Sequence, residues 1–368
     1  MSHLAPFGTL FRYFAARYVG WVGLCLFGLA MIISLIQTVE LVRRVSVRSI
    51  GNDEISYVKL AFLNLPSVIE MILPLSVLAG SMLCFAAWNR TNEFVVVRGF
   101  GQSIWAALSP ALFSSFVIGM LFVTIVNPIA AVTSKEYSKQ MAAIFGEKES
   151  NFTVSTTGIW LRDTLDQGKL IIHGEALNAE TATIINPVIY LYGNDVHVKA
   201  VYSAGLMQLT DSGWVLDHAL RWQNDGQETD LGSIMLPTGL GALDLRQSGL
   251  APQSISVYSL PSFIDSLEKA GIPTTGYLFY LYKTLSVPFL MIGIAMLAAR
   301  FSLRNVSRGR GMWLFSRGAL LASAILIFSY FMQIMGTSMQ LPVRLAALAP
   351  AISILLVGAI ALARTDES

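Results

Sequence analysis

Charged residues are scarce in this chain of 368 residues: only 13% are charged and 54% are hydrophobic, whereas about 25% of a soluble domain is charged. The mean hydropathy is +0.60. This composition argues against an ordinary soluble domain and indicates an integral membrane protein with some soluble mass attached. The few charges are unevenly placed, since residues 134–276 are net acidic and the remainder is net basic. That asymmetry indicates two compartments, and it does not suggest a basic face for nucleic acid.

Cysteine and histidine are also rare. The two cysteines, Cys25 and Cys84, fall within apolar runs, so the rest of the chain has no disulfide framework. None of the four histidines has the H-x-x-H or H-E-x-x-H spacing of a metal site, and no P-loop motif is present for ATP. Serines within apolar runs are typical of helix packing rather than of nucleophiles. We therefore expect no catalytic residues, no metal and no cofactor in this chain.

Long apolar runs are what the chain has in abundance. A helix needs about 20 apolar residues to cross a bilayer, and six runs qualify: 18–39, 66–88, 104–127, 277–300, 313–335 and 344–363. A separate interfacial helix over about 55–65 is expected before the second run. The fold class is thus an α-helical integral membrane protein with six transmembrane helices in a 3 + 3 arrangement. The predicted domains are an N-terminal transmembrane half (1–133), an inserted domain (134–272) and a C-terminal transmembrane half (273–368).

The insertion has the pattern of β-structure. Stretches such as "KLIIHGEA" and "ATIINPVIYLYG" alternate and are rich in β-branched residues, and Gly-Asn-Asp and Asp-Ser-Gly turns interrupt the pattern. Short strands at regular spacing predict a small all-β sandwich or jelly roll. Helical stretches over about 134–146 and 259–270 are expected to lead into and out of it. Open strand edges in such a domain are templates for pairing with another chain.

Arginines in the short loops predict the orientation. The N-terminus, the loop between spans two and three, and the loop between spans four and five lie on one side by span counting. All three are basic, with Arg12, Arg17, Arg90, Arg98, Arg300, Arg304, Arg308, Arg310 and Arg317. That side is expected to be the cytoplasm, which places both termini there and the insertion outside.

Two groups of ionisable residues stand out against this background. Arg43 and Arg44, followed by Arg48, make the loop after span one unusually basic for the outer side. They are interpreted either as ligands for an anionic lipid or as arginines that snorkel and pair with Glu40.

The second group is Glu70 and Lys283, which lie inside or near apolar spans, where ionisable groups are costly and function is the default interpretation. The alternative is that both reach an interface or face a partner subunit.

A short amphipathic segment, residues 89–105, joins spans two and three. We expect a helix over about 91–98, with Asn92 as its N-cap, Glu93 in its first turn, and Phe94, Val97 and Arg98 on its surface. Gly99 and Gly101 end it, and Gly99 is expected to need a positive φ. A short helix with an apolar face and a glycine exit suits docking into a groove of another protein. The alternative is a helix resting on lipid headgroups.

The residues "NEFVVVRGFGQS" resemble the ATPase-coupling segment of the lipopolysaccharide export permeases, the LptF/LptG family. The resemblance covers the whole chain, including "PFGTLFRYFAARYV" near the start, the 3 + 3 spans with a periplasmic β-domain, and the final "LPVRLAALAPAISILLVGAIALAR". The early Pro-Phe-Gly followed by Arg-Tyr is similar to the LptG type rather than to its paralogue LptF.

The resemblance implies a permease subunit in the bacterial inner membrane that takes part in lipopolysaccharide extraction. It also implies partners: an LptF-type permease, an LptB-type ATPase dimer that binds ATP and Mg, and the periplasmic bridge proteins LptC and LptA. It assigns coupling to Asn92, Glu93, Phe94, Val97, Arg98, Gly99 and Gly101, and lipopolysaccharide contact to Arg43, Arg44 and Glu40. Gln37 departs from the family, which carries a further basic residue near the end of span one.

Two other classes of function remain as alternatives. A mechanotransmission-type ABC permease usually has four spans rather than six. A membrane-embedded enzyme that modifies glycolipids would need clustered carboxylates or histidines at one membrane face, and the sequence has no such cluster.

Overall fold

The computed structural model describes most of the chain, with gaps between the described ranges. These ranges are 8–47, 57–145, 152–155, 158–165, 168–178, 183–192, 198–210, 213–222, 228–238, 252–269, 274–303, 311–338 and 340–366. Arg48, Arg304, Arg308 and Arg310 lie outside them. The chain divides into a helical unit, residues 1–145 with 278–368, and a second unit, residues 146–277.

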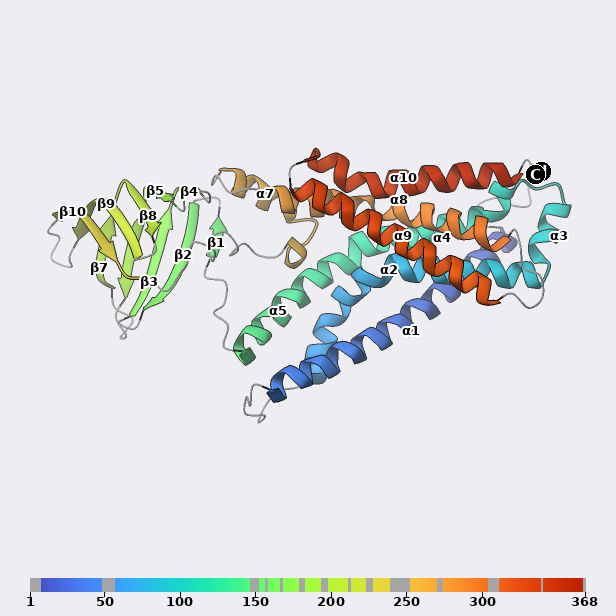
Figure 1. Ribbon diagram of the computed structural model, residues 1–368, viewed down its shortest axis with the longest axis horizontal. Coiled ribbons are helices and arrows are strands. Elements are labelled where there is room, and N and C mark those ends of the chain that lie inside the picture. Colours follow the sequence, from blue (N-terminus) through green and yellow to red (C-terminus); the bar gives the residue numbers. More distant parts are fainter. Residues whose placement is uncertain are drawn as a thin grey trace. The chain divides into compact units, whose positions relative to one another are not determined.

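Six helices of the described chain are long and apolar enough to cross a membrane, and the β region lies between the third and the fourth of them. The expected fold class is therefore confirmed. The helices of the helical unit are α1 (Thr9–Val47), α2 (Tyr57–Arg90), α3 (Glu93–Gly99), α4 (Ile104–Leu121), α5 (Asn127–Phe145), α8 (Thr275–Leu303), α9 (Gly311–Thr337) and α10 (Val343–Asp366) (Figure 1). A π-helical turn, η1 (Phe122–Val126), joins α4 to α5 in one continuous helical run.

The separate interfacial helix expected over 55–65 is wrong, because α2 is unbroken from Tyr57 onward. Both Pro66 and Pro74 lie inside α2. Apolar packing between the two prolines supports the helix: Val68 and Ile72 are buried against Ala30 of α1. In a membrane, neighbouring helices re-satisfy the backbone groups that a proline frees, so tertiary contacts override the local breaker signal.

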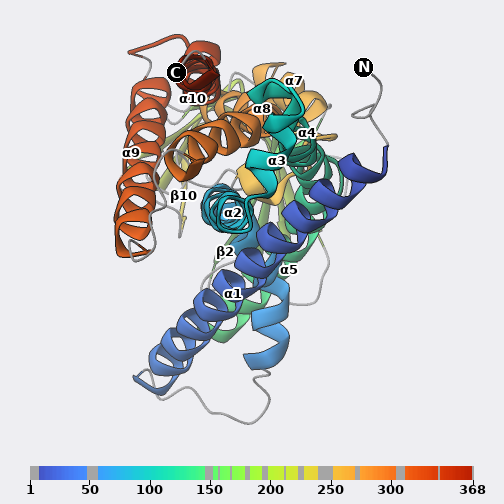
Figure 2. The same cartoon turned by 90° about the vertical axis from the view of Figure 1, so that its right-hand side faces the viewer.

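Glycines allow the helices of this unit to approach closely. A Cβ at Gly80 would lie 2.6 Å from Cα of Val22, so α1 and α2 touch backbone to backbone there. Two residues further along α2, Met82 reaches Gly318 of α9. Contacts between small residues are the usual means of helix packing in a bilayer. Helix α2 therefore lies between α1 and α9, as Figure 2 also shows.

The second unit contains one curled antiparallel sheet in the order β1-β2-β3-β6-β7-β9-β8-β5-β4, with β10 paired to β9. Its strands are β1 (Phe152–Ser155), β2 (Gly158–Leu165), β3 (Gly168–Gly174), β4 (Ala176–Asn178), β5 (Thr183–Ile185), β6 (Val188–Tyr192), β7 (Val198–Ser203), β8 (Leu206–Thr210), β9 (Gly213–Trp222) and β10 (Glu228–Leu236). The first two strands, β1 and β2, were not among the stretches singled out by the sequence pattern.

Strand β9 accounts for the curl of the sheet. One edge of β9 pairs with β8 through residues 213–217 and with β7 through residues 220–222, and its other edge pairs with β10. His218 lies between the two pairings with a φ of 53°, a local irregularity of the kind that bends a strand. Alternate residues Trp214 and Leu216 point into the core beside Met207 and Ile189. The unit ends with η2 (Pro252–Ser254) and the amphipathic helix α7 (Leu260–Lys269).

Candidate functional site

Helix α3 is held between two left-handed backbone positions. Asn92 precedes the helix with a φ of 57°, and Gly101 follows it with a φ of 74°. Asn92 therefore occupies the expected cap position, but its side chain makes no capping hydrogen bond. The expectation that Gly99 needs a positive φ is wrong, because Gly99 is the last helical residue. Gly101 has that requirement instead, and its N–H donates to the carbonyl of Arg98 (2.9 Å) to close the turn.

The two faces of α3 differ in burial. Phe94 and Val97 are buried against the helical unit, each 8% exposed. Val95 and Val96 are 57% and 58% exposed, and Phe100 just after the helix is 79% exposed. Arg98 is exposed as well. An inner face thus anchors α3, while an outer face presents apolar side chains that nothing in the described part of the chain covers.

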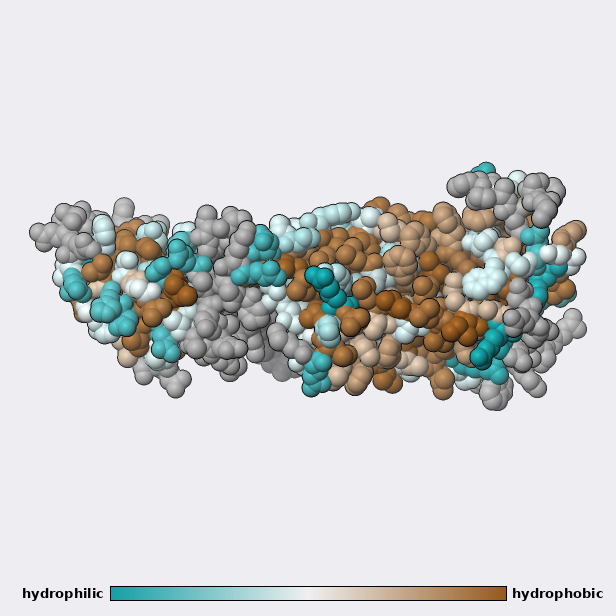
Figure 3. Space-filling model, turned by 90° about the horizontal axis from the view of Figure 1, so that it is seen from above, coloured by the Kyte–Doolittle hydropathy of each residue, from teal (hydrophilic) through white to brown (hydrophobic). Residues whose placement is uncertain are grey.

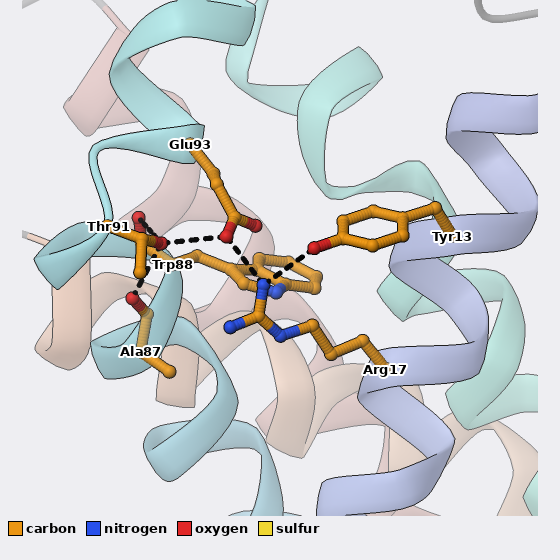
Figure 4. A network of polar contacts seen from close by, with 6 residues as sticks. All are labelled: Tyr13, Arg17, Ala87, Trp88, Thr91 and Glu93. Atoms are coloured by element: carbon orange, nitrogen blue, oxygen red, sulfur yellow. Dashed lines mark hydrogen bonds and ion pairs between the residues drawn. The ribbon is translucent and has the colours of Figure 1, made fainter.

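Glu93, the first residue of α3, contacts α1. Its Oε1 accepts a hydrogen bond from Nη1 of Arg17 (2.5 Å), and the same guanidinium nitrogen donates to the hydroxyl of Tyr13 (2.9 Å) (Figure 4). The hydroxyl of Thr91 also lies 2.9 Å from this carboxylate oxygen. The pair is half-buried, with the side chain of Arg17 30% exposed and that of Glu93 24% exposed. The sequence singled out Glu93 but not its partner, because 76 residues separate the two.

An aromatic cluster lies under this ion pair. The ring of Trp88 contacts those of Phe14 (4.7 Å between centroids) and Phe85 (5.4 Å), and Phe85 in turn contacts Tyr18 (6.0 Å). The hydroxyl of Tyr18 is hydrogen-bonded to Ser81 of α2 and Ser115 of α4, each at 2.6 Å. The first turns of α1 are therefore fixed against α2 and α4 by both packing and polar contacts.

The basic cluster forms at the other end of α1. Arg43 donates twice to Glu40, from Nε (2.9 Å) and Nη2 (2.8 Å), and Nε of Arg44 donates to the same carboxylate (3.0 Å). All three residues are exposed or nearly so, with 67% of the Arg43 side chain and 62% of the Arg44 side chain accessible. Two guanidinium groups share one carboxylate, so the cluster keeps a net positive charge. The predicted pairing with Glu40 is present, and it leaves further donors of both arginines free for an anion.

Gln37, one turn earlier, is committed to a different contact. Its side-chain oxygen accepts a hydrogen bond from Nδ2 of Asn64 on α2 (2.5 Å). The two line a small pocket that also includes Ser34, Thr38 and Tyr137. Gln37 therefore joins α1 to α2 and supplies no charge to the cluster.

Glu70 takes part in a polar network between spans. Both of its oxygens accept from the hydroxyl of Tyr280 on α8 (3.0 and 3.2 Å), and that hydroxyl accepts from Nδ2 of Asn127 (2.8 Å). Asn127 is fully buried and directly follows the π-helical turn. Lys283 is exposed and forms no ion pair with Glu70. Glu70 is thus part of a hydrogen-bond network between helices, whereas the side chain of Lys283 is exposed.

The outer spans expose apolar stripes. Along α1, Leu24, Phe27, Met31, Leu35 and Val39 are between 56% and 70% exposed. Along α9, Leu320, Ile327, Tyr330 and Phe331 are between 51% and 73% exposed. These two helices are the least buried of the six candidate spans. The helical unit is largely hydrophobic on the face seen in Figure 3, as expected of a surface in contact with lipid or with another membrane subunit.

The comparisons with known proteins agree with the architecture. The sequence matches the model of one family, the lipopolysaccharide export system permease LptF/LptG, over residues 12–364. No match was found among curated proteins. The match spans nearly the whole chain, including both transmembrane halves and the β region. The chain therefore belongs to the LptF/LptG family of lipopolysaccharide export permeases.

Proposed function

We propose that this chain is the LptG-type half of an ATP-driven exporter that extracts lipopolysaccharide from the bacterial inner membrane. An LptF-type permease supplies the other half, and an LptB-type ATPase dimer binds ATP with Mg and supplies the energy. The β unit faces the periplasm and passes the lipid to bridge proteins of the LptC and LptA types. Both termini lie in the cytoplasm, on the same side as Arg12, Arg90, Arg98 and Arg317.

The observation that carries this proposal is the outer face of α3. Val95, Val96 and Phe100 form an apolar surface at a helix whose buried face and glycine turn fix its position. Such a surface fits a groove in a soluble partner better than it fits water, because burying it removes apolar area from solvent. Asn92, Glu93, Phe94, Val97, Arg98, Gly99 and Gly101 then form the coupling segment, the inner residues by anchoring it and the outer ones by contact.

The exposed apolar stripes of α1 and α9 support the proposal that a paralogous permease packs against this chain. They flank α2, so one chain offers two apolar faces to a second permease. A lipid cavity forms between spans one and five of the two permeases, and Arg43 and Arg44 stand at one end of α1. Guanidinium groups bind phosphates through two parallel hydrogen bonds, which makes the phosphates of lipid A suitable partners for this cluster.

Lipid-dependent ATP hydrolysis tests the proposal. The complex of this chain with its paralogous permease and ATPase is reconstituted in vesicles, and hydrolysis is measured with lipopolysaccharide, with cardiolipin and without added lipid. We expect lipopolysaccharide to change the rate severalfold and cardiolipin to change it much less. Equal rates under all three conditions would count against this function and would favour the mechanotransmission alternative.

A further inference from the structure

Helix α1 contains both Arg17 of the ion pair and the basic cluster. Helix α1 runs without a break or a proline from Thr9 to Val47, with Arg17 near its first end and Arg43 near its last. At 1.5 Å per residue, the 26 residues between them span about 39 Å, the depth of a bilayer with its interfaces. A continuous helix of this kind can transmit a displacement at Arg17 to a ligand bound at Arg43.

The connection between α2 and α3 is short, and we call its two residues, Thr91 and Asn92, the hinge. These two turn residues separate the helices, and Asn92 has left-handed backbone. At the other end of α3, Gly101 again has a positive φ. A seven-residue helix between two such turns does not continue the backbone of α2, so its direction depends on side-chain contacts, namely the buried Phe94 and Val97 and the ion pair of Glu93. A displacement of α3 would therefore reach the neighbouring helices through these side-chain contacts.

The contact between Arg17 and Glu93 bridges this hinge. The carboxylate belongs to the first turn of α3, and the guanidinium belongs to α1. The hydroxyls of Tyr13 and Thr91 hold the two groups from either side, as Figure 4 shows. Tyr18, the next residue of α1, is fixed by Ser81 and Ser115. The ion pair therefore fastens α3 to a part of α1 that is already rigid.

We propose that Arg17 is a positioning residue that makes α3 and α1 move together, so that ATP-driven displacement of α3 reaches the lipid-binding end of α1. This inference rests on the proposed function. Binding linkage is reciprocal: if nucleotide binding to the ATPase changes the affinity for lipid by some factor, lipid changes the affinity for nucleotide by the same factor. The side chains of the pair are 30% and 24% exposed, so its loss costs some local stability, but the buried Phe94 and Val97 still anchor α3. The loss of Arg17 is therefore expected to change this coupling rather than the assembly of the complex.

The test measures lipid affinity in two nucleotide states. Fluorescent lipopolysaccharide is titrated into the detergent-purified complex, once without nucleotide and once trapped with ATP and vanadate. In the unaltered complex we expect the two dissociation constants to differ. In Arg17→Gln the ratio between them is expected to shrink about fivefold or more, while Arg17→Lys, which keeps the charge, retains most of it. Arg12→Gln is the matched control, because Arg12 is an exposed arginine of the same helix on a different face.

The outcomes separate the two proposals. If the unaltered complex shows no difference between nucleotide states, the proposed function itself fails. Suppose that the unaltered complex does show a difference between nucleotide states. The role of Arg17 is then overturned if Arg17→Gln has the same ratio of dissociation constants as the unaltered complex, or if Arg12→Gln reduces that ratio as much as Arg17→Gln does. Loss of assembly in Arg17→Gln would make the pair a structural clamp and would equally overturn the inference. In that case Tyr13→Phe, which removes only the second anchor of the guanidinium, would be expected to leave the ratio unchanged.

Discussion

The carboxylate of Glu40 accepts hydrogen bonds from both Arg43 and Arg44, but the two arginines donate different numbers of them. Arg43 makes two hydrogen bonds to Glu40 and Arg44 makes one. A phosphate that approaches the cluster therefore finds more unused donors on Arg44 than on Arg43. The carboxylate keeps both side chains close to α1, so under the proposed function a lipid phosphate would meet two arginines that are already oriented.

The double variant Arg43→Ala, Arg44→Ala is expected to weaken lipid capture on the order of tenfold, because two cations near an anionic lipid surface are lost. Arg43→Lys, Arg44→Lys should retain part of the affinity if charge dominates, and little of it if two-point hydrogen bonding does. Photo-crosslinking of lipopolysaccharide to the assembled complex measures both. Equal crosslinking in the double alanine variant and the unaltered chain would remove these residues from the site, provided that the amount of complex is the same.

The hydroxyl of Tyr280 joins Glu70 to Asn127, so Tyr280→Phe leaves two polar side chains without this partner. Hydrogen bonds between helices in membranes contribute roughly 0.6 kcal/mol and at most about 1.7. We expect a loss of about 1 kcal/mol in unfolding free energy, measured by denaturation in mixed micelles. Tyr282→Phe on the same helix is the control, since the ring of Tyr282 contacts Arg344 and that contact needs no hydroxyl. Equal stability of the two variants would contradict a role for the network.

Whole helices were largely predictable from the sequence, whereas their partners were not. The apolar runs that reveal α1, α8 and α10 are long and local, so periodicity is not needed to find them. The start of α2 was missed because Pro66 mimics a boundary. The contacts of Arg17 with Glu93 and of Glu70 with Tyr280 join residues far apart in the chain, and no local pattern encodes such pairs. In the same way, the sequence does not distinguish Gly99 from Gly101, and only the backbone angles of the structure show which of the two has a positive φ.

The turn after α3 provides an element-level test. Gly101 has a φ of 74°, so Gly101→Val forces a β-branched residue into left-handed backbone at a cost of about 1–2 kcal/mol. We expect the ATPase to bind the permease pair at least fivefold more weakly, because α3 is no longer held in its docking direction. Gly99→Ala is the control: Gly99 is helical, and nothing lies within 4 Å of an added Cβ. The affinities are measured by titrating the ATPase into the permease pair. Equal affinity of the two variants for the ATPase would refute the hypothesis that docking requires the positive φ of Gly101.

At the scale of the whole molecule, the six candidate spans divide the loops into two groups, and most of the loop arginines fall in one of them. The six spans and the β unit between the third and the fourth are confirmed, while the side on which each loop lies stays a prediction from the arginines. The predicted domains, 1–133, 134–272 and 273–368, also stay a prediction. The helical unit alone includes both ends of the chain, so the two transmembrane halves fold against each other across a long insertion.

Cysteine labelling tests this orientation. In a background without Cys25 and Cys84, Met235→Cys on β10 is expected to react with an impermeant maleimide in cells with a permeable outer membrane. Phe100→Cys is expected to react only after the inner membrane is opened. Both positions are exposed, at 56% and 79%, so access to the reagent is not limited by burial. Reaction of both from the same side would disprove the topology.

The exposed Phe100, with Val95 and Val96 beside it, also has a consequence for how cells handle this subunit. If α3 docks as proposed, a chain made in excess of its ATPase partner presents an aromatic ring and two branched side chains to water. Chaperones and proteases continuously sort proteins by such exposed apolar segments. Under the proposed function, the surface that docks the ATPase would thus also mark a subunit without its partner for removal, and the abundance of the permease would follow the supply of the ATPase.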